Sequence, residues 1–373
     1  MLKVLTVFGT RPEAIKMAPV VKELERRPES FISRVAVTAQ HREMLDQVLD
    51  LFGIRPDHDL DIMKPGQDLF DITTRALLGL KPILETEQPD VLIVQGDTTT
   101  TFVAALAAFY SKVKVGHVEA GLRSFDKYHP FPEEINRSLT TVIADYHFAP
   151  TTTAKENLLR AGIPEAHIFV TGNTVIDALV QTVRDGYTFT QPDLEPVDFA
   201  GKRIILVTAH RRENWGEPLR RICRAIRGIV ESNPDVEVVF SMHLNPLVQQ
   251  TAKDILGDVD RVHLIKPLDY EPFVQLINRS YLILTDSGGI QEEAPSLGKP
   301  VLVLREVTER PEGVEAGTVR VVGRDTGRIV EAAQLLLSDK EEYNKMARAV
   351  NPYGDGHASE RIADVLERAS TRG

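Results

Sequence analysis

The sequence predicts an α/β protein made of two Rossmann-like, doubly wound domains. Apolar runs of strand length alternate with segments in which apolar residues recur at helical spacing. The strand-like runs, such as Val91–Val94 and Val301–Leu304, are apolar on both faces, which is typical of parallel strands covered by helices on both sides. The alternation stops at residues 186–201 and then begins again, which indicates two units.

The first half begins with a strand, and strand-like runs and helical segments alternate over most of it. The expected strands are Val4–Phe8, Arg34–Thr38, Val91–Val94, Val113–His117 and Ile168–Thr171. The expected helices are Ala14–Leu24, Glu43–Phe52, Thr101–Tyr110 and Val175–Val183. Strands that are joined through helices in this way run parallel in one sheet.

The second half repeats the pattern. Its expected strands are Ile204–Val207, Val236–Phe240, Val262–Ile265, Leu282–Thr285 and Val301–Leu304. Helical spacing follows at 328–349, a breaker at 351–356, and a last helix at Ala358–Ala369.

These elements predict domains at 1–172 and 173–350, with residues 351–373 as a C-terminal helix that packs back on the first domain. Residues 186–201 hold Gly186, Pro192, Pro196 and Gly201 among acidic residues, and we interpret them as a linker or surface excursion.

The composition excludes several classes of protein. The chain has 373 residues, and 44 Lys and Arg against 54 Asp and Glu give a net charge of −10. Without a dense basic block, neither a nucleic acid nor a membrane surface is expected as a partner. The single cysteine, Cys223, cannot form an internal disulfide, which fits a reducing compartment.

The N-terminal sequence MLKVLTVFGTRPEA is interpreted as a buried strand, because it has too few apolar residues for a signal-peptide core. No apolar run approaches the roughly 20 residues that cross a bilayer. We therefore expect a cytoplasmic protein.

Polar side chains follow the strands of both halves, where ligands bind in open α/β sheets. The first half places Gly9–Glu13, Lys16, Gly96–Thr100, His117 and Glu119 there; the second half places Thr208–Asn214, His243 and Asp286–Gly289 there. Two such polar rims predict that the domains face a cleft.

Three carboxylates of the first half, Asp97, Glu119 and Glu133, are candidates for acid-base catalysis. Two have structural alternatives: Asp97 could cap the helix that begins near Thr99, and Glu133 could complement a helix dipole. Their expected convergence on one rim favours catalysis. Arg137, one turn after Glu133, could pair with that carboxylate or hold a substrate.

In the second half, Ser287, Gly288 and Gly289 follow a strand and open a helix, so their N–H groups could bind a diphosphate. The alternative is a serine cap with glycines for a tight turn. Basic residues near element ends favour the diphosphate: Arg11, Lys16, His210 and Arg310.

A carboxylate further along the same helix could bind ribose hydroxyls. Glu293 is favoured over Glu292, since adjacent helical residues point about 100° apart and both cannot do so equally.

Several familiar motifs are missing from the sequence: G-x-G-x-x-G after a strand, G-x-x-x-x-G-K-[ST] and H-E-x-x-H. No pair of histidines has metal-ligand spacing on one helix, so neither a metal nor a cofactor is expected. Among the ten histidines, His210 is the one to which we assign a function.

Eight motifs together identify a known family. They are GTRPEAIKMAP at 9, GDTTTT at 96, HVEAGLRS at 117, PEEINR at 132, HRREN at 210, DSGGIQEEAPSLGKP at 286, TERPE at 308 and NPYGDG at 351. With them the chain resembles the non-hydrolysing UDP-N-acetylglucosamine 2-epimerases nearly from end to end. Gln95 departs from the pattern, because many members have histidine there.

The resemblance implies a GT-B-like fold, a homodimer, and reversible interconversion of UDP-N-acetylglucosamine and UDP-N-acetylmannosamine, a precursor of bacterial surface polysaccharides. It implies catalytic roles for Asp97, Glu119, Glu133 and His210. It implies ligand contacts for Arg11, Lys16, Arg137, Phe273, Ser287, Gly288, Gly289 and Glu293, to which His243 and Arg310 are added as candidates. Bacterial members are often activated by a second substrate molecule, for which Gln40, Arg42, Glu43 and His243 are candidate contacts.

The chemistry of this reaction needs more than a base, because the hydrogen at C2 of the sugar is not α to a carbonyl. We expect UDP to leave, a C2 proton to be lost to give a 2-acetamidoglucal, and the proton to return on the opposite face as UDP adds again. Domain closure is expected to exclude water. The alternatives are a hydrolysing epimerase that releases UDP and N-acetylmannosamine, a GT-B glycosyltransferase, and a nucleotide-sugar sensor without activity.

Overall fold

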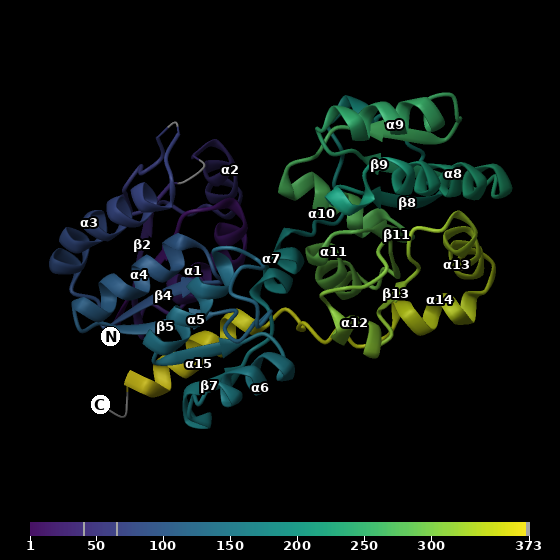
Figure 1. Ribbon diagram of the computed structural model, residues 1–373. Helices are drawn as coiled ribbons and strands as arrows, with labels where there is room; N and C mark the ends of the chain where they lie inside the picture. Colours follow the sequence, from purple (N-terminus) through teal and green to yellow (C-terminus); the bar gives the residue numbers. More distant parts are fainter. Residues whose placement is uncertain (40–41, 65, 371–373) are drawn as a thin grey trace. The chain divides into compact units, whose positions relative to one another are not determined.

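The computed structural model describes residues 1–39, 42–64 and 66–370. The chain divides into two compact units, Met1–Gln181 with Tyr353–Gly373, and Thr182–Pro352. In each unit helices pack against a parallel sheet (Figure 1). This confirms the predicted fold class of two Rossmann-like α/β domains.

The sheet of the first unit has the strand order β3-β2-β1-β4-β5-β6-β7, and its neighbouring strands pair in parallel. The strands are β1 (Leu2–Phe8), β2 (Phe31–Val37), β3 (His58–Asp59), β4 (Val91–Gln95), β5 (Lys114–Val118), β6 (Tyr146–Ala149) and β7 (Ile168–Val170). The chain fills one side of β1 first and then the other, so the order of the strands reverses between β1 and β4.

The helices of the first unit follow the strands in turn. They are α1 (Arg11–Arg26), α2 (Arg42–Phe52), α3 (Leu69–Glu87), α4 (Thr99–Tyr110), α5 (Glu133–Ile143), α6 (Thr152–Arg160), α7 (Thr174–Thr182) and the C-terminal α15 (Ala358–Ser370). Apolar side chains of α3 and α4, such as Leu80 and Ala104, pack against Leu5 and Leu92 of the sheet.

The sheet of the second unit has the order β10-β9-β8-β11-β12-β13, also with parallel pairing. The strands are β8 (Arg203–Thr208), β9 (Val236–Ser241), β10 (Val262–Ile265), β11 (Leu282–Thr285), β12 (Val301–Val303) and β13 (Val319–Val321). Here the order reverses between β8 and β11.

The helices of the second unit cover both faces of its sheet. They are α8 (Glu217–Ser232), α9 (Pro246–Leu256), α10 (Tyr270–Arg279), α11 (Gly288–Glu293), α12 (Pro311–Glu315), α13 (Thr326–Ser338) and α14 (Lys340–Ala347). Ile205 of β8 lies in one core cluster with Ile226 of α8, and Leu206 lies in another with Leu276 of α10. Successive residues of a buried strand therefore meet helices on opposite faces, as the apolar runs predict.

Each strand expected from the sequence forms, but three further strands escaped the prediction. The strands β3, β6 and β13 are short, and β6 contains a histidine and a tyrosine, so none has the apolar pattern of the others. The helical spacing at 328–349 forms two helices, because Asp339 ends α13 and its side chain accepts the N–H groups of Glu341 and Glu342 at the start of α14.

The interpretation of residues 186–201 as a linker is wrong for part of this segment. Leu194 and Val197 are buried in a core cluster of the second unit, and the Phe189 ring stacks on Phe199 with centroids 4.8 Å apart. The prolines and glycines of this segment interrupt any regular spacing, so the sequence pattern did not indicate that these few apolar residues are buried.

Helix α7 lies in the first unit as far as residue 181, whereas the sequence pattern predicts a domain boundary at 172/173. The carboxylate of Asp177 in α7 is fully buried and accepts the N–H groups of Ala358 (3.1 Å) and Ser359 (2.7 Å). It therefore caps α15, which also contacts α1 through an ion pair of Arg27 and Asp364 (2.6 Å).

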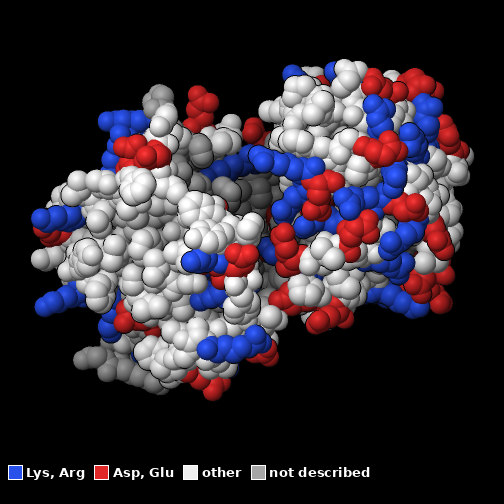
Figure 2. All heavy atoms as spheres, viewed as in Figure 1, with Lys and Arg blue, Asp and Glu red and all other residues white. Residues whose placement is uncertain are grey.

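The surface of the first unit has a broad uncharged area in the view of Figure 2, while acidic and basic side chains are mixed over the second unit. Exposed apolar side chains of α3, α4 and α5 include Leu78, Phe109, Tyr110, Leu139 and Val142.

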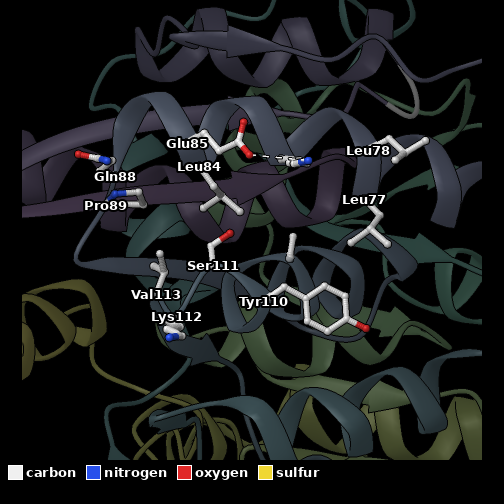
Figure 3. A pocket seen from close by; sticks show the side chains of 12 residues that line it. Leu77, Leu78, Leu84, Glu85, Gln88, Pro89, Tyr110, Ser111, Lys112 and Val113 are labelled. Atoms are coloured by element: carbon white, nitrogen blue, oxygen red, sulfur yellow. Dashed lines mark ion pairs between the residues drawn. The ribbon is translucent and has the colours of Figure 1, made fainter.

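A cavity of about 680 Å³ lies between the ends of α3 and α4 (Figure 3). It is lined by Leu77, Leu84, Tyr110 and residues such as Pro89 and Val113, which precede β4 and β5. None of the candidate site residues lines it, because they follow the carboxyl ends of these strands and the cavity adjoins the amino ends.

Candidate functional site

Several candidate residues lie at the two places where the strand order reverses. In the first unit, Thr10–Lys16 follow β1 and Asp97 follows β4; in the second, His210 follows β8 and Asp286–Gly289 follow β11. At such a switch point the connections that leave two neighbouring strands run in opposite directions, which leaves a crevice between them for ligands. The topology therefore puts candidate residues of each unit at the edge where α/β proteins bind ligands.

Glu13 joins the two loops at the switch point of the first unit. With Thr10 it forms a capping box at the start of α1, where its carboxylate accepts the Thr10 N–H at 2.8 Å. The same carboxylate accepts the hydroxyls of Thr98 (2.6 Å) and Thr101 (3.1 Å), which follow β4. Glu13 is only 2% exposed, so it fixes the loops rather than facing a ligand.

Glu119 is held by residues from three other segments. Lys16 donates to both of its carboxylate oxygens, at 2.7 and 2.6 Å, and Asn173 donates at 3.2 Å. The side chain of Gln95 also donates to it. Glu119 has φ +62°, a left-handed conformation that costs a non-glycine residue energy and that often marks functional sites.

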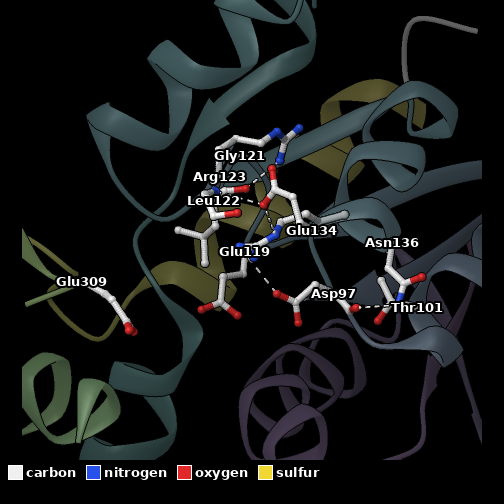
Figure 4. Close-up of polar contacts among 12 residues, drawn as sticks. Asp97, Thr101, Glu119, Gly121, Leu122, Arg123, Glu134, Asn136 and Glu309 are labelled. Carbon is white, nitrogen blue, oxygen red and sulfur yellow. Dashed lines mark hydrogen bonds and ion pairs between the residues drawn. The ribbon is translucent and has the colours of Figure 1, made fainter. Parts of the chain in front are cut away.

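Asp97 lies beside Glu119, and Figure 4 shows the two carboxylates pointing to the same side. Burial raises the pKa of Asp97 to about 6; Arg137 opposes this shift, and the nearby Glu119 adds to it. The Asp97 side chain is 32% exposed, and its Oδ2 lies 3.7 Å from Nη1 of Arg137. A carboxyl that changes charge near neutral pH is suited to proton transfer.

Asp97 is not the cap of α4. Thr98 caps this helix, with its hydroxyl accepting the Thr101 N–H at 3.1 Å. The structural alternative for Asp97 is therefore wrong.

The adjacent residues Glu133 and Glu134 have different surroundings at the start of α5. Glu134 is buried and accepts the N–H groups of Ser124 (2.9 Å) and Phe125 (3.3 Å) and pairs with Arg137 (3.0 Å). In the described part of the chain, Oε2 of Glu133 is buried without a hydrogen-bond partner, and this carboxylate contributes to the raised pKa of Asp97. The structure thus brings Asp97, Glu119, Glu133, Lys16 and Arg137 together.

His117 lies behind this group in β5 and is fully buried. Its Nε2 lies 2.7 Å from the Gly96 carbonyl oxygen, and burial lowers the pKa of His117 to about 4. The neutral ring therefore donates this hydrogen to the carbonyl that precedes Asp97, which steadies the turn after β4.

Asn173 was missed by the sequence analysis. It is 3% exposed, its side-chain oxygen accepts the Val175 N–H (3.1 Å) at the start of α7, and its amide donates to Glu119. Its backbone N–H donates to the Tyr353 carbonyl (2.7 Å), so it also ties down the C-terminal segment. An asparagine before a helix reads as an ordinary cap, and only the fold reveals its contact with Glu119 54 residues away.

Replacing Asn173 with alanine is expected to lower kcat about tenfold, the equivalent of one hydrogen bond to a charged group. Loss of the helix cap should also cost about 1 kcal/mol of stability. The control is Thr151→Ala, which removes the cap of α6 (Ala154 N–H, 3.2 Å) and should lower the melting temperature alone. Equal kcat values for both variants would contradict the role of Asn173.

His210 of the second unit is held by Asp286. Its Nδ1 lies 3.0 Å from the Asp286 carboxylate, and the His210 ring lies near that of His243, with centroids 6.5 Å apart. His210 is 41% exposed and Asp286 is fully buried.

The loop that follows β11 is flanked by positive charge. A Cβ atom built on Gly288 would lie 3.8 Å from the Arg310 guanidinium and 4.0 Å from that of Arg211. Ser287 precedes α11 and makes no side-chain capping bond, so this hydroxyl does not serve the helix as the alternative reading supposed.

Glu292 and Glu293 are distinguished by their contacts. Glu292 is 4% exposed and pairs with Arg310, whereas Glu293 is half-buried and reaches back toward Gly289. A Cβ on Gly289 would lie 3.3 Å from the Glu293 carboxylate. These contacts favour Glu293 as the ligand of the two.

The remaining candidates lie at the starts of helices or in the loops before them. Arg11 begins α1, half-buried Phe273 lies in α10, and exposed His243 follows β9. Glu43 is exposed in the first turn of α2. Gln40 and the side chain of Arg42 lie outside the described residues, so the possible second-substrate contacts stay predictions.

No group of three or more His, Cys, Asp or Glu side chains is placed to hold a metal ion, as far as the described residues go. None of the helices in the described ranges is long and apolar enough to span a bilayer.

Comparisons with known proteins agree over almost the whole chain. The model of a family described as UDP-N-acetylglucosamine 2-epimerase matches residues 22–367. The UDP-N-acetylglucosamine 2-epimerase of Salmonella typhimurium is 58% identical over 373 residues, covering 98% of each chain. That of Bacillus subtilis is 59% identical over 365 residues, covering 98% of this chain and 95% of the relative.

Solved structures are similar as well. The UDP-GlcNAc 2-epimerase of Neisseria meningitidis, determined with bound UDP-GlcNAc, has a TM-score of 0.86 and 53% identity, covering 98% of this chain and 100% of the other. The UDP-GlcNAc 2-epimerase of Methanocaldococcus jannaschii has a TM-score of 0.87 and 36% identity, with the same coverage.

Proposed function

Because this chain belongs to the UDP-N-acetylglucosamine 2-epimerase family, we propose that it reversibly interconverts UDP-N-acetylglucosamine and UDP-N-acetylmannosamine without releasing free sugar. The observation that carries the proposal is Asp97, whose pKa is raised to about 6 beside the Lys16-bound carboxylate of Glu119. This pair lies at the switch point of the first sheet, where a ligand is expected.

Three carboxylates have different tasks in the proposed reaction. The ion pair with Lys16 favours the charged form of Glu119, which stabilises the positive charge that develops at C1 as the C1–O bond breaks. Asp97 takes the C2 proton in one direction and returns it in the other. The proton on the opposite face is assigned to Glu133. Its Oε2 is buried without a hydrogen-bond partner among the described residues, which supports a contact with a bound sugar rather than with the protein.

The second unit is proposed to hold the UDP moiety. Loss of UDP leaves negative charge on the diphosphate, and the guanidinium groups of Arg310 and Arg211 beside Gly288 are suited to stabilise it. Glu293 is assigned to the ribose hydroxyls. His210 is assigned to the departing phosphate.

The deciding experiment is NMR of the enzyme with UDP-N-acetylglucosamine in heavy water. We expect UDP-N-acetylmannosamine to appear, deuterium to enter C2 of both sugars, and free UDP not to accumulate. Stoichiometric UDP with free N-acetylmannosamine would instead identify the hydrolysing alternative. An absence of C2 exchange would reject the epimerase and leave the glycosyltransferase or the sensor.

The proposal includes the homodimer that the resemblance implies and the cytoplasmic location expected from the sequence. The exposed apolar side chains on α3, α4 and α5 support a surface on which a second copy packs. Sedimentation of the wild-type protein at twice the monomer mass of 41.6 kDa is the expected result.

A further inference from the structure

The carboxylate of Asp286, directly after β11, is the centre of the polar contacts around His210. It is fully buried and accepts the backbone N–H groups of His210 (2.9 Å) and Arg211 (2.9 Å). It also accepts the Asn214 amide (2.7 Å) and faces Nδ1 of the His210 ring (3.0 Å). A backbone hydrogen bond joins the two strand ends, from the Asp286 N–H to the Thr208 carbonyl at 3.3 Å.

These donors decide the charge of Asp286. Burial alone would raise its pKa, but the hydrogen bonds from His210, Arg211 and Asn214 outweigh burial and hold the pKa of Asp286 below its usual range. An ionised carboxylate can only accept hydrogen bonds. Nδ1 of His210 must therefore carry the hydrogen, and Nε2 is the ring nitrogen that faces away from Asp286.

Asp286 itself is not placed to contact a substrate. Its side chain has no exposed surface, and a second anion would repel a diphosphate. Asn214, which is 1% exposed, holds it from the other side and donates to the Leu304 carbonyl as well (3.2 Å). The carboxylate is thus enclosed by protein groups that fix its position.

We propose that Asp286 is a positioning residue that acts through His210. It keeps Nδ1–H against its carboxylate and directs Nε2 toward the UDP moiety, where Nε2 takes a proton from solvent water and donates it in a hydrogen bond to the departing phosphate oxygen. This inference rests on the proposed function, because it assigns the support for a residue of that site.

The test is a double-mutant cycle with Asp286→Asn and His210→Gln, followed by the rate of epimerisation. D286N should lower kcat by about 100-fold, as loss of a group that orients a catalytic histidine does, while Kd for UDP changes less than threefold. In the H210Q background D286N should have no further effect, because its effect passes through the ring. A 100-fold loss in both backgrounds, or normal turnover of D286N, would overturn the inference.

Asp177→Asn is the matched control, since Asp177 is an equally buried carboxylate that accepts the backbone N–H groups of Ala358 and Ser359 and has no hydrogen bond to a histidine in the described part of the chain. D177N should lower the melting temperature. Any change in kcat that D177N causes should be equal in the wild-type and the H210Q backgrounds.

A spectroscopic measurement covers the case in which D286N does not fold. Nitrogen-15 NMR of the wild-type imidazole should show the Nδ1–H form of neutral His210. Finding the Nε2–H form would overturn the inference, whereas wild-type enzyme that shows no C2 exchange would reject the proposed function and not the arrangement of Asp286 and His210.

Discussion

Asp97→Asn is expected to lower kcat by about 10³-fold, within the range that a positioned acid-base group contributes, while UDP binds normally. Asparagine keeps the size of the side chain but cannot accept or return a proton. Rates and UDP affinity are measured by coupled assay and calorimetry. Near-normal turnover of this variant would remove the assignment of Asp97.

Above pH 6, Asp97→Asn should be at least as stable as the wild-type protein. Because the pKa of Asp97 is raised from 3.8 to about 6 in the folded protein, the folded state binds this proton more tightly than the unfolded chain. Stability from this group therefore falls as the pH rises from about 4 to 6, and asparagine removes that loss. An equal or higher melting temperature at pH 7.5 together with lost turnover would separate catalysis from folding.

The pH profile of the wild type gives an independent check. If ionised Asp97 accepts the C2 proton, kcat/KM should fall as the pH drops below about 6. Arg137 lowers this pKa, so Arg137→Gln should move the acid limb to higher pH. Asp145→Asn, which affects a half-buried aspartate at the amino end of β6, should leave the limb in place. A limb that does not move in R137Q would argue against Asp97.

Glu119→Gln is expected to lower kcat by about 10²- to 10³-fold and to destabilise the fold by up to about 3 kcal/mol. The variant removes the negative charge that Lys16 contacts at 2.6 Å and leaves this half-buried ammonium against a neutral amide. It also removes the negative charge that is assigned to stabilise the positive charge developing at C1 of the sugar. Kinetics and thermal unfolding measure the two losses separately.

Glu23→Gln provides the control for the stability part. Glu23 of α1 is 7% exposed and pairs with Arg26 (2.8 Å) and with Arg27 (2.6 Å) directly after the helix, and these contacts include no candidate site residue. E23Q should therefore lose stability and keep its turnover. If E119Q and E23Q lose only stability, Glu119 has a structural role alone.

The comparisons confirm the resemblance to the UDP-N-acetylglucosamine 2-epimerases, and the structure brings together Asp97, Glu119 and Glu133 at the predicted rim. The motifs GDTTTT and HVEAGLRS predicted Asp97 and Glu119 at the rim because these residues follow buried strands, whereas Glu133 begins α5. Asn173 and Asp286 were not assigned roles. Asn173 has the position of an ordinary helix cap and Asp286 that of a residue at a strand end, and sequence spacing alone does not indicate that they contact Glu119 and His210.

The sequence by itself determined the local structure: the buried strands, the capping box of Thr10 and Glu13, and the polar turns after each strand. These features depend on residues a few positions apart, so side-chain periodicity and capping chemistry define them. Only the tertiary structure decided which groups meet: Lys16 with Glu119 across 103 positions, and His210 with Asp286 across 76. Those pairs depend on which strands lie side by side in each sheet, and strand order is set by the packing of the whole unit.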